Sequence, residues 1–114
     1  MIGTHKYQRF HCHGAVQLTG DGNRSVWGHV GEICLAGFYV FTYGPWPINT
    51  DVKFHVEVEG TVICGVGTVA TRNPGVGMSI VFHNLSPEYQ QELESVIHEL
   101  SKSAVAPAGM GLRI

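Results

Sequence analysis

A short cationic segment near the start of the chain, His5-Lys6-Tyr7-Gln8-Arg9, contains side chains that bind anions. The guanidinium of Arg9 can donate two parallel hydrogen bonds to phosphate oxygens, and it can stack on a flat ring. Lys6 adds a positive charge, whereas His5 offers fewer donors than an arginine. We therefore expect an anion-binding segment with Arg9 as the chief contact and Lys6 and His5 assisting.

A second segment, Glu32-Ile33-Cys34-Leu35-Ala36-Gly37, places an acid, a thiol and a glycine close together. The carboxylate of Glu32 can accept hydrogen bonds from N–H donors, while the thiol of Cys34 donates more weakly than a hydroxyl would. Simpler interpretations stay open: Glu32 as a turn-capping or solvated acid, Cys34 as a small buried hydrophobe, and Gly37 as a residue that permits a bend.

The sequence His11-Cys12-His13 raises the question of a metal site, because His11 and His13 share one face of a strand and imidazole binds zinc, copper or nickel. Cys12 points the other way, and no CxxC or HxxxH motif supplies further ligands, so we expect no metal and no cofactor. No motif joins a nucleophile, a base and oxyanion donors, and no glycine-rich phosphate loop is present. We expect a protein that binds rather than an enzyme.

Six stretches, which alternate between apolar and polar residues or are short and rich in β-formers, are separated by turn residues, and this predicts six strands. The expected strands are 9–19, 26–33, 38–43, 51–59, 61–72 and 77–83. Gly65 and Gly67 in the fifth predict a bend or a close backbone contact. Short links without intervening helices favour an all-β antiparallel barrel or sandwich, whose sheet edges are closed or protected.

The pattern changes at Ser86-Pro87-Glu88, which is typical of a helix start: a capping hydroxyl, a proline in the first turn and an acid at the positive helix end. An apolar stripe at helical spacing follows, formed by Tyr89, Leu93, Val96, Ile97 and Leu100. We expect this helix to pack on the barrel or on a partner. The interpretation is one domain, 1–102, with a flexible tail at 103–114.

Composition limits the function further. The formal net charge is −2 and the pI is near 6.4, which argues against a partner that is a nucleic-acid polymer. Cys12, Cys34 and Cys64 are odd in number and widely spaced, and no signal segment precedes them, so we expect reduced thiols in the cytoplasm. No apolar run approaches the ~20 residues that span a bilayer.

The order of these features resembles the PilZ family of bacterial cyclic di-GMP receptors over roughly residues 5 to 100. That family has an R-x-x-x-R motif before the first strand, which aligns with His5 and Arg9. It also has a D/N-x-S-x-x-G motif after the second strand, which aligns with Glu32, Cys34 and Gly37. The first arginine, the acid and the serine are all altered here. The resemblance implies a six-stranded antiparallel PilZ-like split barrel with one C-terminal α-helix.

The resemblance also implies a function: a stand-alone domain that binds cyclic di-GMP, weakly because of the altered motifs, through His5, Lys6 and Arg9, with Glu32, Cys34 and Gly37 around the base. In the family the arginine segment wraps over the ligand, so its ordering would signal to a separate protein partner. An alternative is an adaptor that has lost the nucleotide and binds proteins through Tyr39, Tyr43 and Trp46. A metal-binding protein ranks third, and dimerisation through the helix or tail stays open.

Overall fold

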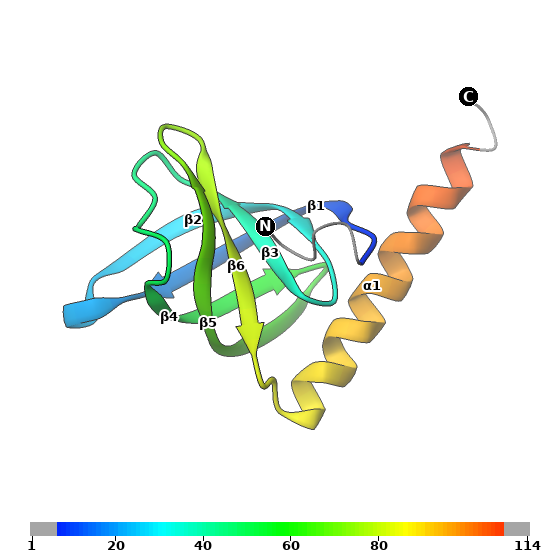
Figure 1. The fold of residues 1–114 in the computed structure, drawn as a ribbon. Helices are drawn as coiled ribbons and strands as arrows, with labels where there is room; N and C mark the ends of the chain where they lie inside the picture. The colour runs from blue at the N-terminus through cyan, green and yellow to red at the C-terminus, as the bar shows by residue number, and fades with distance from the viewer. Residues whose placement is uncertain (1–6, 109–114) are drawn as a thin grey trace.

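The computed structural model describes residues 7–108, apart from the side chains of residue 21 and of residues 103–108. This part of the chain forms six strands followed by one long helix (Figure 1). A short 3-10 helix, η2 (Asp21–Asn23), joins the first two strands. The elements are β1 (Phe10–Thr19), β2 (Ser25–Ile33), β3 (Gly37–Phe41), β4 (Asp51–Val58), β5 (Thr61–Asn73), β6 (Gly77–His83) and α1 (Pro87–Ala108). The predicted six strands and C-terminal helix are confirmed.

The six strands form one closed barrel. Each strand pairs antiparallel with two neighbours in the order β1-β2-β3-β6-β5-β4, and β4 pairs again with β1. The structure therefore decides for the barrel over the sandwich. Closure removes exposed sheet edges, so neighbouring chains find no unpaired strand to extend. Figure 1 shows α1 running along one side of the barrel, away from the end of β6.

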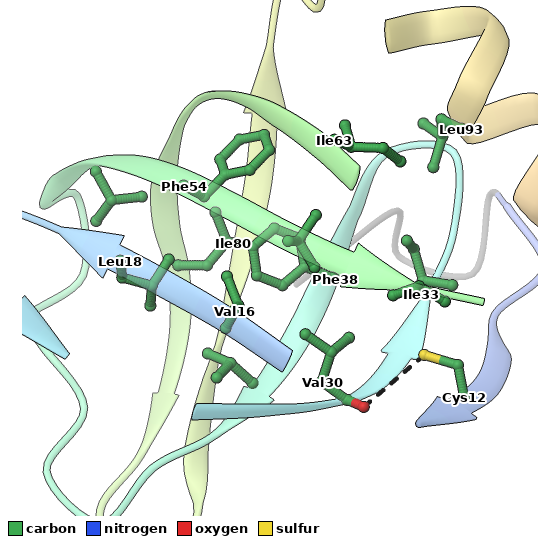
Figure 2. Packing of buried hydrophobic residues seen from close by; sticks show 14 of the residues in the cluster. Cys12, Val16, Leu18, Val30, Ile33, Phe38, Phe54, Ile63, Ile80 and Leu93 are labelled. Atoms are coloured by element: carbon green, nitrogen blue, oxygen red, sulfur yellow. Dashed lines mark hydrogen bonds between the residues drawn. The ribbon is translucent and has the colours of Figure 1, made fainter. Parts of the chain in front are cut away.

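Alternation of side chains fills the interior. Along β4, buried and exposed residues alternate over the whole strand, as the sequence predicts. Phe38 is fully buried, and its ring centroid lies 5.4 Å from that of Phe54 and 5.8 Å from that of Phe82. Figure 2 shows Phe38 surrounded by aliphatic side chains from several strands, among them Val16 and Ile80. Burial of these apolar side chains supplies the main stabilisation of the barrel.

Three irregularities interrupt the strand pairing. One lies in β1 between His11 and Gly14, a second between β2 and β3 at Val30/Glu32, and a third between β5 and β6 at Val69/Thr71. The predicted bend at Gly65 and Gly67 is not where the pairing of β5 shifts. Gly67 instead makes the predicted close backbone contact, because a Cβ there would meet the carbonyl oxygen of Val81.

The helix begins as the sequence predicts. The Ser86 hydroxyl accepts a hydrogen bond from the Tyr89 N–H at 3.2 Å, which satisfies a donor of the first turn. Leu93, Val96 and Leu100 are buried against the barrel, where α1 contacts β1 and β5. The helix continues to Ala108, past the predicted domain end at 102, and residues 109–114 of the predicted tail lie outside the described residues. Within 7–108, no helix is both long and apolar enough to cross a membrane.

The link between β3 and β4 corrects one interpretation. Trp46, expected to help anchor a protein partner, is only 6% exposed, and its ring lies against Gly20. Its backbone N–H donates to the sulfur of Met78, and Arg24 stacks over its ring at 5.5 Å. Trp46 therefore belongs to the core, because the loop folds back over the end of the barrel.

Candidate functional site

The two segments singled out in the sequence meet at one end of the barrel. Phe10 pairs with Ile33 and His11 with Glu32, so the start of β1 lies beside the end of β2. This register brings Nη1 of Arg9 to 3.9 Å from Oε1 of Glu32, with about one third of each side chain exposed. Nδ1 of His11 lies 3.9 Å from the other carboxylate oxygen of Glu32. The charged head groups are thus together and accessible from solvent.

The turn between β2 and β3 is held by its own backbone and by one thiol. The Cys34 N–H donates to the Gly37 carbonyl at 2.9 Å, and the Ala36 N–H donates to Sγ of Cys34 at 3.3 Å. The Phe82 N–H donates to the Ala36 carbonyl at 2.9 Å, which ties the turn to β6. Because Cys34 is only 1% exposed, its sulfur accepts this hydrogen bond on the buried side of the turn. The altered serine position is occupied by a weak acceptor that supports the backbone.

Gly37 is required by a close approach of two strands. It is buried and pairs with Val81, and a Cβ at this position would run into the carbonyl oxygen of Ile80 on β6. The contact is with backbone, which cannot move aside without breaking strand pairing. Gly37 therefore fixes where the turn ends and β3 begins.

Of the predicted site residues, Arg9 and Glu32 are in contact, Cys34 and Gly37 shape the adjoining turn, and His5 and Lys6 lie outside the described residues. Tyr39, which the sequence did not assign to this site, pairs with Glu32. Burial, and then the negative charge of Glu32, raises the pKa of the Tyr39 hydroxyl. That Tyr39 lies beside Glu32 follows from the pairing of β2 with β3, which the sequence alone does not reveal.

A second feature that the sequence did not reveal is a small hollow of about 320 Å³ beside the turn. It lies between Tyr7, the tip of the turn at Leu35, and the start of α1 at Gln90. Leu35 and Tyr7 are each 37% exposed, so apolar and aromatic surface faces solvent next to the Arg9–Glu32 contact. A flat ring could pack here against apolar side chains.

The described residues hold no group of three or more His, Cys, Asp or Glu side chains placed to bind a metal ion. The site offers a guanidinium, a carboxylate and apolar surface, which suit an anion joined to an aromatic ring.

No protein-family model matches the chain, and no curated protein matches it. Solved structures do. The PilZ domain of YcgR from Escherichia coli, determined with c-di-GMP, is similar over 95% of this chain and 99% of that one, with a TM-score of 0.71 and 17% sequence identity. The chain has the PilZ fold. The PilZ domain of CeSA from a cellulose-synthesizing bacterium is similar over 82% of this chain and 98% of that one, with a TM-score of 0.63 and 17% identity.

A larger structure, YcgR from Escherichia coli in complex with c-di-GMP, gives a TM-score of 0.77 at 17% identity over 93% of this chain. This chain spans 50% of the length of that one. At such identities the likeness establishes the PilZ arrangement of barrel and helix. The ligand has to be argued from the side chains of this chain.

Proposed function

We propose that this PilZ-fold domain binds cyclic di-GMP at the end of the barrel that carries Arg9 and Glu32, and that it signals to a partner protein in the cytoplasm without catalysing a reaction. The observation that carries the proposal is the contact of 3.9 Å between the Arg9 guanidinium and the Glu32 carboxylate. This contact brings together one residue from each of the two segments that resemble PilZ motifs, and both side chains are partly exposed.

The chemistry of the ligand fits this pair. A cyclic guanine dinucleotide carries two phosphates, to which a guanidinium fork can donate, and guanine N–H groups, to which a carboxylate can accept. Ligand binding would exchange the Arg9–Glu32 contact for contacts with phosphate and base. Part of the binding free energy is spent on this exchange, because both partners already interact in the unbound protein.

Weak binding follows from the altered positions. Each lost or misplaced hydrogen bond to a ligand group costs about 1–3 kcal/mol, and every 1.4 kcal/mol changes the dissociation constant tenfold. The thiol of Cys34 supports the turn and so offers no strong donor to the ligand. We expect a dissociation constant in the micromolar range.

Calorimetric titration with cyclic di-GMP tests the proposal. The wild type should release measurable heat, and Arg9→Ala should weaken binding by about tenfold or more because it removes a charge-assisted contact. Arg24→Ala is a matched control, since Arg24 is exposed and lies over Trp46 at the opposite end of the barrel. No heat with the wild type up to high micromolar ligand would refute nucleotide binding.

Restoring the family residues provides a gain-of-function arm. We would first combine His5→Arg with Cys34→Ser and then add Glu32→Asp in that background. These changes should tighten cyclic di-GMP binding about tenfold or more. The shorter acid would also draw back from Arg9 and release the guanidinium from this contact. An unchanged affinity in all these variants would show that the altered motifs are not what limits binding.

The second candidate, an adaptor without a nucleotide, is favoured by exposed aromatic side chains. Tyr43 is 88% exposed and Trp27 is 69% exposed, and aromatic residues of this kind anchor protein interfaces. If this role holds, a partner recovered with the wild type should be lost with a Trp27→Ala/Tyr43→Ala double variant and should be indifferent to cyclic di-GMP. A partner retained by the double variant would exclude this surface.

A further inference from the structure

A hollow of about 850 Å³ lies on the outer wall of the barrel, next to the Arg9–Glu32 site. Its sides come from β1, β2, β3, β4 and the β4–β5 turn. His11 belongs both to this hollow and to the contact with Glu32. The volume falls within the ~300–1,000 Å³ range of small-molecule sites.

The pairing register explains why the wall is hollowed here. Glu57, Ala15, His29 and Phe41 form one row across four neighbouring strands, because Ala15 pairs with both Glu57 and His29, and His29 pairs with Phe41. Neighbouring strands are ~4.8 Å apart, so Glu57 and His29 are separated by ~10 Å with only a methyl group between them. The long side chains stand at the edges and the small residue forms the floor.

Two irregularities of strand pairing meet at Gly31. In the pairing of β1 with β2 the register shifts between His11 and Gly14, and in that of β2 with β3 it shifts at Gly31, between Val30 and Glu32. A Cβ at Gly31 would enter the ring of Phe41, so this ring lies over the glycine. Bulges of this kind redirect side chains and are frequent beside binding sites.

Two carboxylates act on Cys12, a buried residue beside the floor of the hollow. Cys12 forms part of it, and its Sγ donates to the Val30 carbonyl at 3.8 Å (Figure 2). Burial raises the pKa of the Cys12 thiol to about 11, with further contributions from the negative charges of Glu59 and then Glu32. Glu57 and Glu59 themselves line the hollow, so their carboxylates can meet hydrogen-bond donors of a ligand there.

These groups match a guanine. Its N1–H and exocyclic N–H2 are donors that a carboxylate accepts, its O6 and N7 are acceptors to which an imidazole N–H can donate, and its flat ring can stack on an aromatic side chain. Glu57 and Glu59 supply the carboxylates, His13 and His29 the imidazoles, and Phe41 the ring.

We propose that this hollow is a guanine-base subsite, built by Glu57, His29 and Phe41, that adjoins the Arg9–Glu32 site through His11. This inference rests on the proposed binding of cyclic di-GMP and extends it to residues on the barrel wall. The base comes either from the second half of the dinucleotide bound at Arg9 or from a second dinucleotide molecule.

Calorimetry on two exposed positions tests the subsite. Phe41→Leu removes the stacking ring, and Glu57→Gln removes the charge that accepts from guanine; each should weaken cyclic di-GMP binding about tenfold. Glu57→Gln should also narrow the preference for cyclic di-GMP over cyclic di-AMP, because adenine lacks the N1–H and the exocyclic N–H2 at C2. Ile48→Ala and Glu92→Gln are matched controls, since both residues are exposed and neither lines the hollow.

The outcomes separate this proposal from the preceding one. If Arg9→Ala weakens binding while Phe41→Leu and Glu57→Gln do not, nucleotide binding stands and the subsite is refuted. If the wild type does not bind cyclic di-GMP, titration with GMP followed by NMR decides: shifts confined to the amides of Ala15, His29 and Gly31 support the subsite, and their absence overturns it. A stoichiometry of one dinucleotide per chain means that the base is the second half of the molecule bound at Arg9. Two dinucleotides per chain mean that a second molecule supplies it.

Discussion

The Arg9–Glu32 site and the hollow over Gly31 lie side by side on the barrel, yet they are built in different ways. At the first, regular pairing of β1 with β2 places a charged pair next to a turn whose residues follow a sequence motif. At the second, pairing is interrupted on both sides of Gly31, and the lining residues come from distant parts of the chain. At the first, Gly37 contacts the backbone of a neighbouring strand, and at the second, Gly31 contacts the ring of Phe41.

The same difference is found between two glycines, Gly37 beside the first site and Gly31 in the second. Gly37 is pressed against a backbone carbonyl of β6, whereas Gly31 is covered only by the side chain of Phe41. A backbone contact cannot relax without loss of strand hydrogen bonds, while a ring can rotate away. The same substitution at the two positions should therefore affect stability at one and binding at the other.

The largest expected effect is that of Gly37→Ala. The new methyl group would overlap the Ile80 carbonyl and force β3 and β6 apart, which should lower the free energy of unfolding by about 3 kcal/mol or more. Urea denaturation followed by circular dichroism measures it. Gly44→Ala is the control, because a Cβ at Gly44 meets no atom within 4 Å. Equal stability of the two variants would break the comparison drawn between the two glycines.

The sequence predicted the regular parts of this structure well. The alternation along 51–58 and the apolar stripe of α1 follow directly from residue periodicity, and Ser86 caps the helix as its position indicates. Periodicity reports which face a residue takes, so elements with one buried face can be predicted.

The irregular parts could not be predicted in this way. Trp46 was taken for an interface residue because nothing local reveals that its loop folds back over Gly20. The row from Glu57 to Phe41 joins four strands whose register is fixed by bulges, and bulges leave no mark in an alternation pattern. The candidate site was predicted from the resemblance of two segments to family motifs, and one residue of each segment, Arg9 and Glu32, lies in contact with the other.

A smaller effect concerns the pKa of Cys12. Its thiol is influenced by one carboxylate from each region, Glu59 of the hollow and Glu32 of the Arg9 site. Burial and the charges of Glu59 and Glu32 raise its pKa from 9.0 to about 11, so the folded protein holds the thiol proton more tightly than the unfolded chain. The stabilisation is complete below pH 9 and is lost as the pH rises towards 11. The free energy of unfolding should fall by about 2 kcal/mol across this window relative to a Cys12→Val variant, which has no thiol to titrate.

Ultraviolet absorbance of the thiolate, taken as the difference from Cys12→Val, separates the two carboxylates. Glu59→Gln should lower the pKa of Cys12 more than Glu32→Gln does, because Glu59 contributes the larger charge effect. The reverse order would mean that the charge acting on Cys12 comes mainly from Glu32 at the Arg9 site, and Cys12 would no longer distinguish the two regions.

The smallest expected effect, that of Gly31→Ala, completes the comparison. The added methyl group meets the far end of the Phe41 ring, which can turn aside, so stability should change by less than about 1 kcal/mol. The displaced ring should no longer stack on a base, and cyclic di-GMP binding should weaken about fivefold. In a Phe41→Leu background the same substitution should have almost no effect on binding, because the ring it displaces is already gone. Additive losses in the double variant would show that Gly31 acts on the ligand by a route other than Phe41.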